Sequence, residues 1–101
     1  MARECMVFHF HQAVPMGDVE STLHLARLAV ASLHGDDRVR LQAETEVDRT
    51  RRICRIETTR EVGQALALIF GGYVRREFGD DAVQIERRAF MREAQPREVV
   101  T

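Results

Sequence analysis

The sequence predicts an α+β domain in which two helices cover one face of a four-stranded antiparallel sheet. Four segments alternate apolar and polar residues as strands do, and two longer segments repeat apolar residues at helical spacing. Glycine, proline and capping residues separate these segments. The chain has 101 residues, of which 45% are hydrophobic and 31% are charged, a composition typical of one soluble globular domain.

The first three elements follow in order from the beginning of the chain. Alternation over residues 5–12 predicts a strand. Asp18 is a suitable N-cap for a helix over residues 19–33, and Gly35 is placed to end that helix. Alternation returns over residues 38–48, which predicts a second strand.

The remaining elements begin after a short polar turn. A third strand is predicted over residues 52–57. Thr58 and Glu61 have the spacing of a capping box, so a second helix is expected to run from there to Gly79. Residues 83–86 alternate again and predict the fourth strand.

The order β-α-β-β-α-β, with right-handed crossovers, predicts a ferredoxin-like sheet with the first and third strands at its centre and both helices on one face. This domain is expected to span residues 1–91. Residues 92–101 contain Pro96 and little apolar surface to bury, so we expect a short frayed tail there. The predicted core residues are Phe8, Phe10, Leu23, Leu41, Ile56, Leu66, Ile69 and Ile85.

Charge and composition argue against several classes of function. The formal net charge is −1, so nothing global attracts the chain to nucleic acid or to an anionic membrane. The longest apolar run without charge, residues 62–74, is shorter than the ~20 residues that a membrane-spanning helix needs. The N-terminal residues do not resemble an export signal, which predicts a cytoplasmic protein with Cys5 and Cys54 as free thiols. All fifteen basic residues are arginine, which indicates a GC-rich, bacterial genome.

The pattern His9-Phe10-His11 places two imidazoles on one side of the first predicted strand. Because Phe10 faces the helices, both histidines are expected on the open face of the sheet. Their expected neighbours are Ile53, Arg55, Glu57, Gln84, Glu86 and Arg88. Two imidazoles with Glu57 or Glu86 could hold a divalent metal, but the arginines would compete for the carboxylates. We therefore expect no metal, with a site of His9, His11 and Glu57 as the alternative.

The same pattern resembles the metal-binding motif of the HUH endonucleases, which are the relaxases and rolling-circle replication nickases. The resemblance rests on His9, Phe10 and His11, with Tyr73 as the only tyrosine that could serve as the nucleophile. It implies a ferredoxin-like sheet, a divalent metal and cleavage of single-stranded DNA through the tyrosine. The predicted topology places Tyr73 on a helix that packs on the other side of the sheet from the histidines.

RNA binding is a further possibility for this topology. RNA recognition motifs stack bases on aromatic residues of the first and third strands. Here the corresponding positions on the open face hold His9, His11, Ile53 and Arg55, because the phenylalanines of the first strand point inward. We therefore do not expect nucleic acid as a partner.

Both predicted helices carry more apolar surface than one sheet can cover. Residues 25–33 contain only two polar side chains, and residues 65–74 contain no charged one. A helix that is apolar on all sides should be covered on all sides. Gly63, Ala67 and Gly71 also form a stripe of small residues, which would allow close approach of the other helix or of a partner chain. The predicted partner-contact residues are Leu25, Leu28, Ala67, Leu68, Gly71 and Gly72.

These features favour a small non-catalytic module of a bacterial assembly, which acts in oligomerisation or protein interaction and uses no cofactor. No residue is assigned to catalysis. The first alternative is a metal- or anion-binding site on the open sheet face, including the nickase. The second is a regulatory domain that binds a small ligand between subunits.

Overall fold

The structure is a computed structural model that describes residues 2–91, so the predicted tail, residues 92–101, lies outside the described residues. The elements follow in the order β1 (Ala2–Phe10), α1 (Met16–His34), α2 (Asp36–Gln42), β2 (Thr45–Asp48), β3 (Ile53–Glu57), α3 (Glu61–Phe78), the 3₁₀ helix η1 (Asp80–Ala82) and β4 (Val83–Met91). The predicted α+β class and the four-stranded antiparallel sheet are confirmed.

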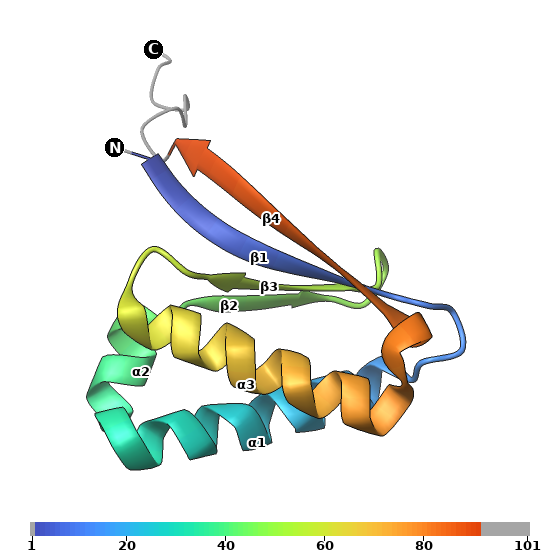
Figure 1. The fold of residues 1–101 in the computed structure, drawn as a ribbon, viewed down its shortest axis with the longest axis horizontal. Coiled ribbons are helices and arrows are strands. Elements are labelled where there is room, and N and C mark those ends of the chain that lie inside the picture. The colour runs from blue at the N-terminus through green and yellow to red at the C-terminus, as the bar shows by residue number, and fades with distance from the viewer. Residues whose placement is uncertain (1, 92–101) are drawn as a thin grey trace.

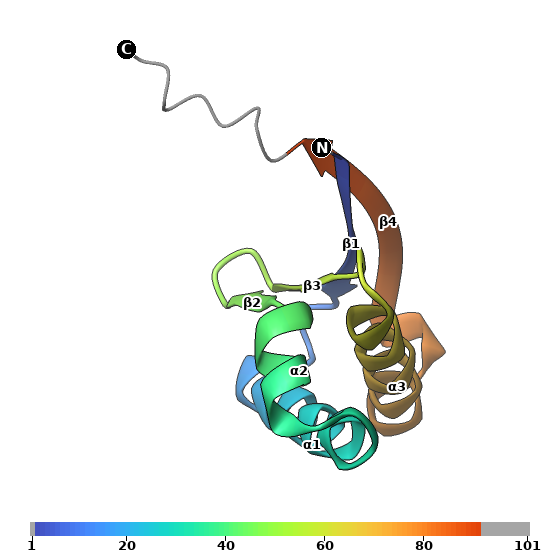
Figure 2. The ribbon, with the colours of Figure 1, turned by 90° about the vertical axis from the view of Figure 1, so that its left-hand side faces the viewer.

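The strands lie in the order β2-β3-β1-β4, so β1 and β3 occupy the centre of the sheet as predicted. β1 pairs with β3 from Cys5 to His9, and it pairs with β4 along its whole length, from Ala2 opposite Met91 to Phe10 opposite Val83. The helices lie together on one side of the sheet (Figures 1 and 2). Beyond β3, the ends of β1 and β4 continue as a two-stranded ribbon that rises away from the helices (Figure 1).

The predicted second strand is wrong in its first half, where the structure has a third α-helix. α2 takes Asp36–Gln42, and β2 contains only Thr45–Asp48. The aspartates of the first turn of α2 interact favourably with the helix dipole, and Arg40 donates a hydrogen bond to Asp37 at 2.6 Å. Val39 and Ala43 are the buried residues of this segment. Their spacing of four residues fits the repeat of a helix and also fits the alternation of a strand, so the sequence pattern is compatible with both.

Helix starts also differ from the predictions. α1 begins at Met16 with Pro15 as its N-cap, and Asp18 supplies a negative charge in its first turn instead of capping it. Arg60 occupies the N-cap position of α3, and no side chain caps that helix. Thr58 acts through its backbone, since its N–H donates to the carbonyl of Glu4 at 2.8 Å. Both predicted C-terminal glycines do end α-helices, at Gly35 and Gly79.

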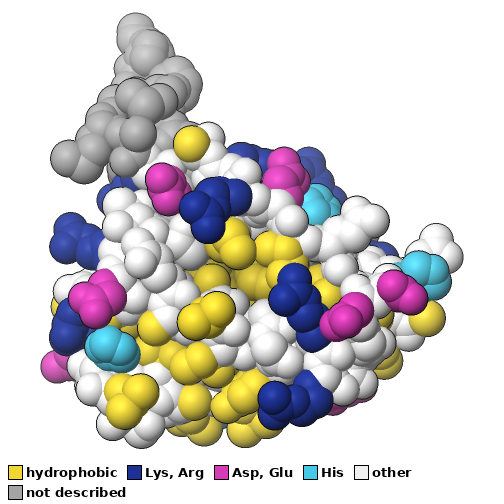
Figure 3. All heavy atoms as spheres, viewed as in Figure 1, with side chains coloured by type: hydrophobic (Ala, Val, Ile, Leu, Met, Phe, Trp, Pro, Cys, Tyr) yellow, Lys and Arg dark blue, Asp and Glu magenta, His cyan; other side chains and the backbone are white. Residues whose placement is uncertain are grey.

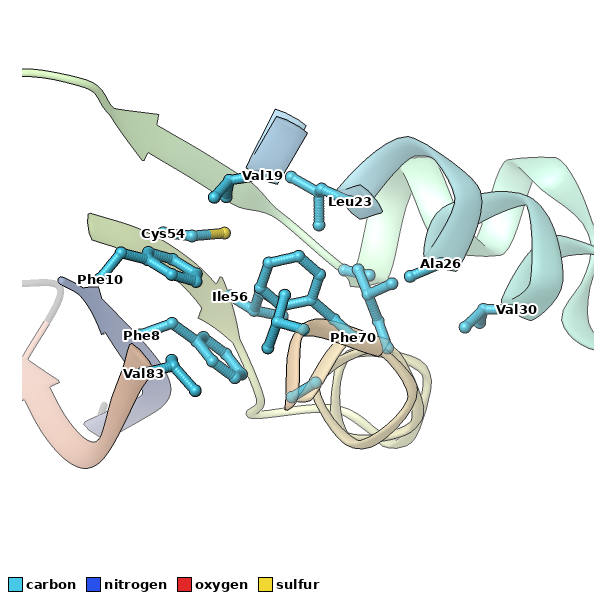
Figure 4. Packing of buried hydrophobic residues seen from close by; sticks show 14 of the residues in the cluster. Phe8, Phe10, Val19, Leu23, Ala26, Val30, Cys54, Ile56, Phe70 and Val83 are labelled. Carbon is cyan, nitrogen blue, oxygen red and sulfur yellow. The ribbon is translucent and has the colours of Figure 1, made fainter. Parts of the chain in front are cut away.

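The core lies between the sheet and the helices α1 and α3 (Figure 4). Phe70 of α3 stands at its centre, with its ring edge-on to Phe8 at 4.9 Å and to Phe10 at 6.4 Å between ring centroids. Five predicted core residues are buried: Phe8, Phe10, Leu23, Ile56 and Leu66. Ile69 and Ile85 are half-buried at its border. Leu41 is wrong as a core residue, because it projects from α2 and is 80% exposed.

The stripe of small residues on α3 faces the sheet of its own chain. A Cβ atom added to Gly63 would lie 2.0 Å from the carbonyl oxygen of Glu57, and one added to Gly71 would lie 3.6 Å from the ring of Phe8. Ala67, between them, is buried. The stripe therefore allows α3 to approach the strands closely. The sequence predicted that it contacts the other helix or a partner chain, and neither contact is needed to explain the small residues.

Gly63→Ala is expected to lower the free energy of unfolding by ~1–3 kcal/mol, because the collision with the Glu57 carbonyl outweighs a gain of about 1 kcal/mol in helix propensity. Gly72→Ala is the matched control in the same helix. Outside its own helix nothing lies within 4 Å of the added Cβ, so this variant should gain up to about 1 kcal/mol. Urea denaturation measures both values. Equal stabilisation by the two substitutions would contradict a constraint at Gly63.

Candidate functional site

The open face of the sheet carries the predicted histidine site. His9, Val7 and Cys5 of β1 lie on this face, each between one residue of β3 and one of β4. The three rows are Ile53–His9–Gln84, Arg55–Val7–Glu86 and Glu57–Cys5–Arg88. The residues predicted as neighbours all lie on this face, but only Ile53, Gln84 and Glu86 lie beside His9, and His11 is not on the face.

Glu86 of β4 joins two of the cations on this face. Arg88 Nη2 donates to Glu86 Oε1 at 2.8 Å, and His9 Nε2 lies 3.0 Å from the same oxygen. The hydrogen bonds from Arg88 and His9 lower the pKa of Glu86 below its ordinary value, and Glu86 in turn raises the pKa of Arg88. All three side chains are about half exposed, so solvent screens these attractions.

The alternative metal site of His9, His11 and Glu57 is not assembled. Glu57 and His9 lie two rows apart on the open face, a separation of ~13 Å along the strand. Arg3 donates to both carboxylate oxygens of Glu57, at 3.0 and 2.8 Å. Within residues 2–91, no three histidine, cysteine or acidic side chains are grouped closely enough to hold a metal ion.

His11 lies beyond the end of β1, in the connection to α1. Its Nδ1 accepts a hydrogen bond from the N–H of Ala13 at 3.1 Å, and its carbonyl accepts one from Arg52 at 2.8 Å. Arg52 reaches this connection from the turn between β2 and β3, where it adopts a positive φ of 59°. The two histidines therefore belong to different local structures, and the role of Arg52 was not predicted.

Tyr73 and His9 lie on opposite sides of the sheet. Tyr73 packs, partly buried, against the core from α3, whereas His9 faces away from the helices. The sheet separates Tyr73 from His9, and His11 lies off the sheet in the connection to α1, so the structure does not place the three groups of the HUH-like pattern on one face.

Two small side chains on the open face are buried although no helix covers them. Val7 is 0% and Cys5 2% exposed, and neither belongs to the core cluster on the helical side. Long arginine and glutamate side chains stand on both sides of them, and the apolar stems of these side chains provide the cover. Burial raises the pKa of the Cys5 thiol and raises that of Cys54 to about 12, so neither thiol is a ready nucleophile. This packing was not predicted, although small apolar residues flanked by arginine and glutamate are its signal.

The predicted partner-contact residues fall into two groups. The exposed members are Leu25 at 57%, Leu28 at 53%, Leu68 at 78%, and Gly72. Ala67 and Gly71 are buried against the sheet of their own chain, so the exposed part of the predicted surface on α3 consists of Leu68 and Gly72. Figure 3 shows that hydrophobic side chains gather on the face that α3 presents to the viewer, with charged side chains around them.

A hollow of about 400 Å³ lies between α3 and the ribbon of β1 and β4. Its lining consists of Glu4, Met6, Thr58, Gln64, Ala67, Leu68 and Arg87. Met6 and Arg87 face each other in the β1–β4 ladder, and the exposed Leu68 lies beside this pair. The hollow therefore lies between the β1–β4 side of the sheet and the side of α3 that carries Ala67 and Leu68, which we call the apolar flank of α3.

Zinc, manganese and magnesium are expected not to bind stoichiometrically at micromolar concentration, because His9, His11 and Glu57 do not converge. Isothermal titration calorimetry measures this directly. Micromolar binding by the parent chain that disappears in a His9→Ala, His11→Ala double variant would contradict the prediction.

Glu86→Gln is expected to make folding less sensitive to acid. The folded-state pKa of Glu86 is lowered, so its stabilisation is complete above the ordinary carboxyl pKa of about 4.3 and is lost as the pH falls through the lower folded value. Below about pH 5, the free energy of unfolding should therefore fall less steeply in the variant than in the parent chain. Glu44→Gln, at an exposed carboxylate outside these ion pairs, is the control. Parallel pH profiles for Glu86→Gln and the parent would contradict the ion-pair assignment.

None of the helices within residues 2–91 combines the length and the apolar character that crossing a membrane requires. Comparison of the sequence with models of protein families and with curated proteins found no match.

Proposed function

We propose that the chain is a small non-catalytic module of a bacterial, cytoplasmic assembly, and that it acts by self-association through its helical layer. The observation that carries this proposal is the exposure of Leu25, Leu28 and Leu68, each by more than half. Single exposed leucines are common on protein surfaces, but apolar side chains gathered over neighbouring helices are typical of an interaction site.

The open face of the sheet is a weaker candidate for such contacts. Its charged side chains are engaged within the chain, as in the pairs Arg3–Glu57, Arg55–Glu46 and Arg88–Glu86. Its two apolar residues, Val7 and Cys5, are already covered. Interfaces are centred on aromatic and aliphatic side chains that lose contact with water, and α1 and α3 offer such side chains.

We also propose that the fold is a ferredoxin-like arrangement with one added helix. Without α2, the element order is βαββαβ, which is the order of that arrangement. The strand order read from the other edge is β4-β1-β3-β2, with β1 and β3 central. Folds of this kind carry many unrelated functions, so the arrangement favours no particular one.

Leu68→Glu is expected to weaken self-association by roughly tenfold or more, because it places a charge among side chains that must lose water on contact. The far-ultraviolet circular dichroism should not change. Leu41→Glu is the matched control, since Leu41 is equally exposed but lies on α2, and this variant should associate like the parent. Sedimentation velocity at micromolar concentration measures all three chains. A parent chain that sediments only as a monomer would contradict the proposal.

A further inference from the structure

The outer edge of β4 is a long strand edge with no neighbour among the described residues. β4 has nine residues, all of which pair with β1 on the inner side, whereas β2 at the other edge of the sheet has four. Native edge strands are commonly short, bulged or covered, because free N–H and C=O groups attract another strand. An edge of this length, whose ladder with β1 runs without a bulge, is therefore suited to pairing.

The hydrogen bonds fix which backbone groups of β4 point outward. The N–H of His11 donates to the carbonyl of Ala82 at 2.9 Å, and hydrogen-bonded pairs alternate along an antiparallel ladder, so the even-numbered residues of β4 bond to β1. On the other side of β1, the N–H of Phe10 donates to the carbonyl of Arg52 at 3.0 Å. The even-numbered residues of β1 therefore bond toward β3 and its odd-numbered residues bond toward β4, which agrees with this alternation. The outward groups are those of Val83, Ile85, Arg87, Ala89 and Met91.

We propose that β4 pairs antiparallel with β4 of a second copy of this chain, about a twofold axis at Arg87, so that two sheets become one. The inference rests on the self-association proposed above and names its contact. In this register Val83 faces Met91 of the second copy, so the whole strand is paired. Glu86 faces Arg88 of the second copy, and Arg88 faces its Glu86, so the ion pair that each chain forms between these two residues becomes part of a group of four charges across the contact. These are positions without mutual hydrogen bonds, where facing side chains lie closest.

The charges select this register from its neighbours. A shift by one residue would place open-face residues opposite helix-face residues, which the pleat of the sheet does not allow. A shift by two residues would place Glu86 opposite Glu86 in one direction and Arg88 opposite Arg88 in the other. A surface that is complementary to itself is what a twofold interface requires, and for this reason we favour a second copy over an unrelated strand.

The same axis brings the apolar flanks of α3 together. Leu68 lines the hollow that contains Met6 and Arg87, and these two residues form the row of the ladder at the axis. α3 and the outer edge of β4 lie on the same side of the molecule (Figures 1 and 2). Leu68 therefore packs near its own counterpart in the dimer. Arg87 meets a second Arg87 at the axis, which is the one like-charged pair of this register, and Glu4 lines the same hollow in each chain.

The test uses two variants, each of which reverses the sign of one charge on β4. Glu86→Arg and Arg88→Glu, taken singly, are expected to weaken the homodimer at least about tenfold, because each places two like-charged pairs opposite one another. In an equimolar mixture, the arginines of one variant face the glutamates of the other, so a mixed dimer should form with nearly the parent affinity. Sedimentation velocity measures the association, and native mass spectrometry identifies the mixed species. Both variants lose the Glu86–Arg88 pair within the chain, so recovery on mixing cannot come from restored folding.

Glu46→Arg is the matched control, because Glu46 lies on β2, at the far edge of the sheet, and pairs there with Arg55. It should associate like the parent chain. Ala89→Pro removes an outward N–H without touching the β1–β4 ladder, so it should abolish association and leave the circular dichroism unchanged.

Charge variants that associate as well as the parent, or that gain nothing on mixing, would overturn the β4 contact. If Leu68→Glu still disrupts association in that case, self-association through the helical layer is supported and only the β4–β4 contact is contradicted. A parent chain that stays monomeric would overturn both.

Discussion

The close approach of α3 to the sheet is the constraint on which the other features depend. Gly63 lies against the carbonyl of Glu57, and Phe70 places its ring against Phe8 and Phe10. Because the side chains of a strand alternate, directing these phenylalanines inward directs Cys5, Val7 and His9 outward. The composition of the open face is thus a consequence of how one helix packs on the opposite face.

The open face has the residue types of a metal-binding or catalytic site but not the geometry of one. Histidine, cysteine, glutamate and arginine all occur there, yet the register separates them into rows and each carboxylate has a cation beside it. Partners within the chain satisfy these charges, and their stems cover the small side chains beneath. The edge of the sheet at β4 and the exposed side of α3 differ from the open face, because their groups are not satisfied within the chain. Leu68 is exposed, and the outward backbone groups of β4 have no partner among the described residues.

Sequence periodicity was sufficient where a segment has a single interpretation and failed where it has two. The alternation over residues 5–12 and 52–57 fits a strand and not a helix, so both central strands and the open-face position of His9 were predicted correctly. The end of the first strand was not, because β1 stops at Phe10 and leaves His11 in the following connection. Val39 and Ala43 fit either periodicity, and the tertiary packing that buries Val39 of α2 and the C-cap residue Ala43 cannot be read from the sequence. The stripe of small residues on α3 was recognised, but spacing alone cannot say which surface it faces.

The full-length pairing of β1 with β4 has a consequence for folding. The ladder joins the two ends of the described chain, so its contacts are among the most distant in sequence that the domain could make. Contacts of this kind bear the entropy of closing a large loop and slow the folding of small domains. On the ribosome, β1 must wait for almost all of the domain to be synthesised before its second neighbour exists. Until then, a central strand is an edge strand, and the nascent domain is most exposed to pairing with the wrong chain.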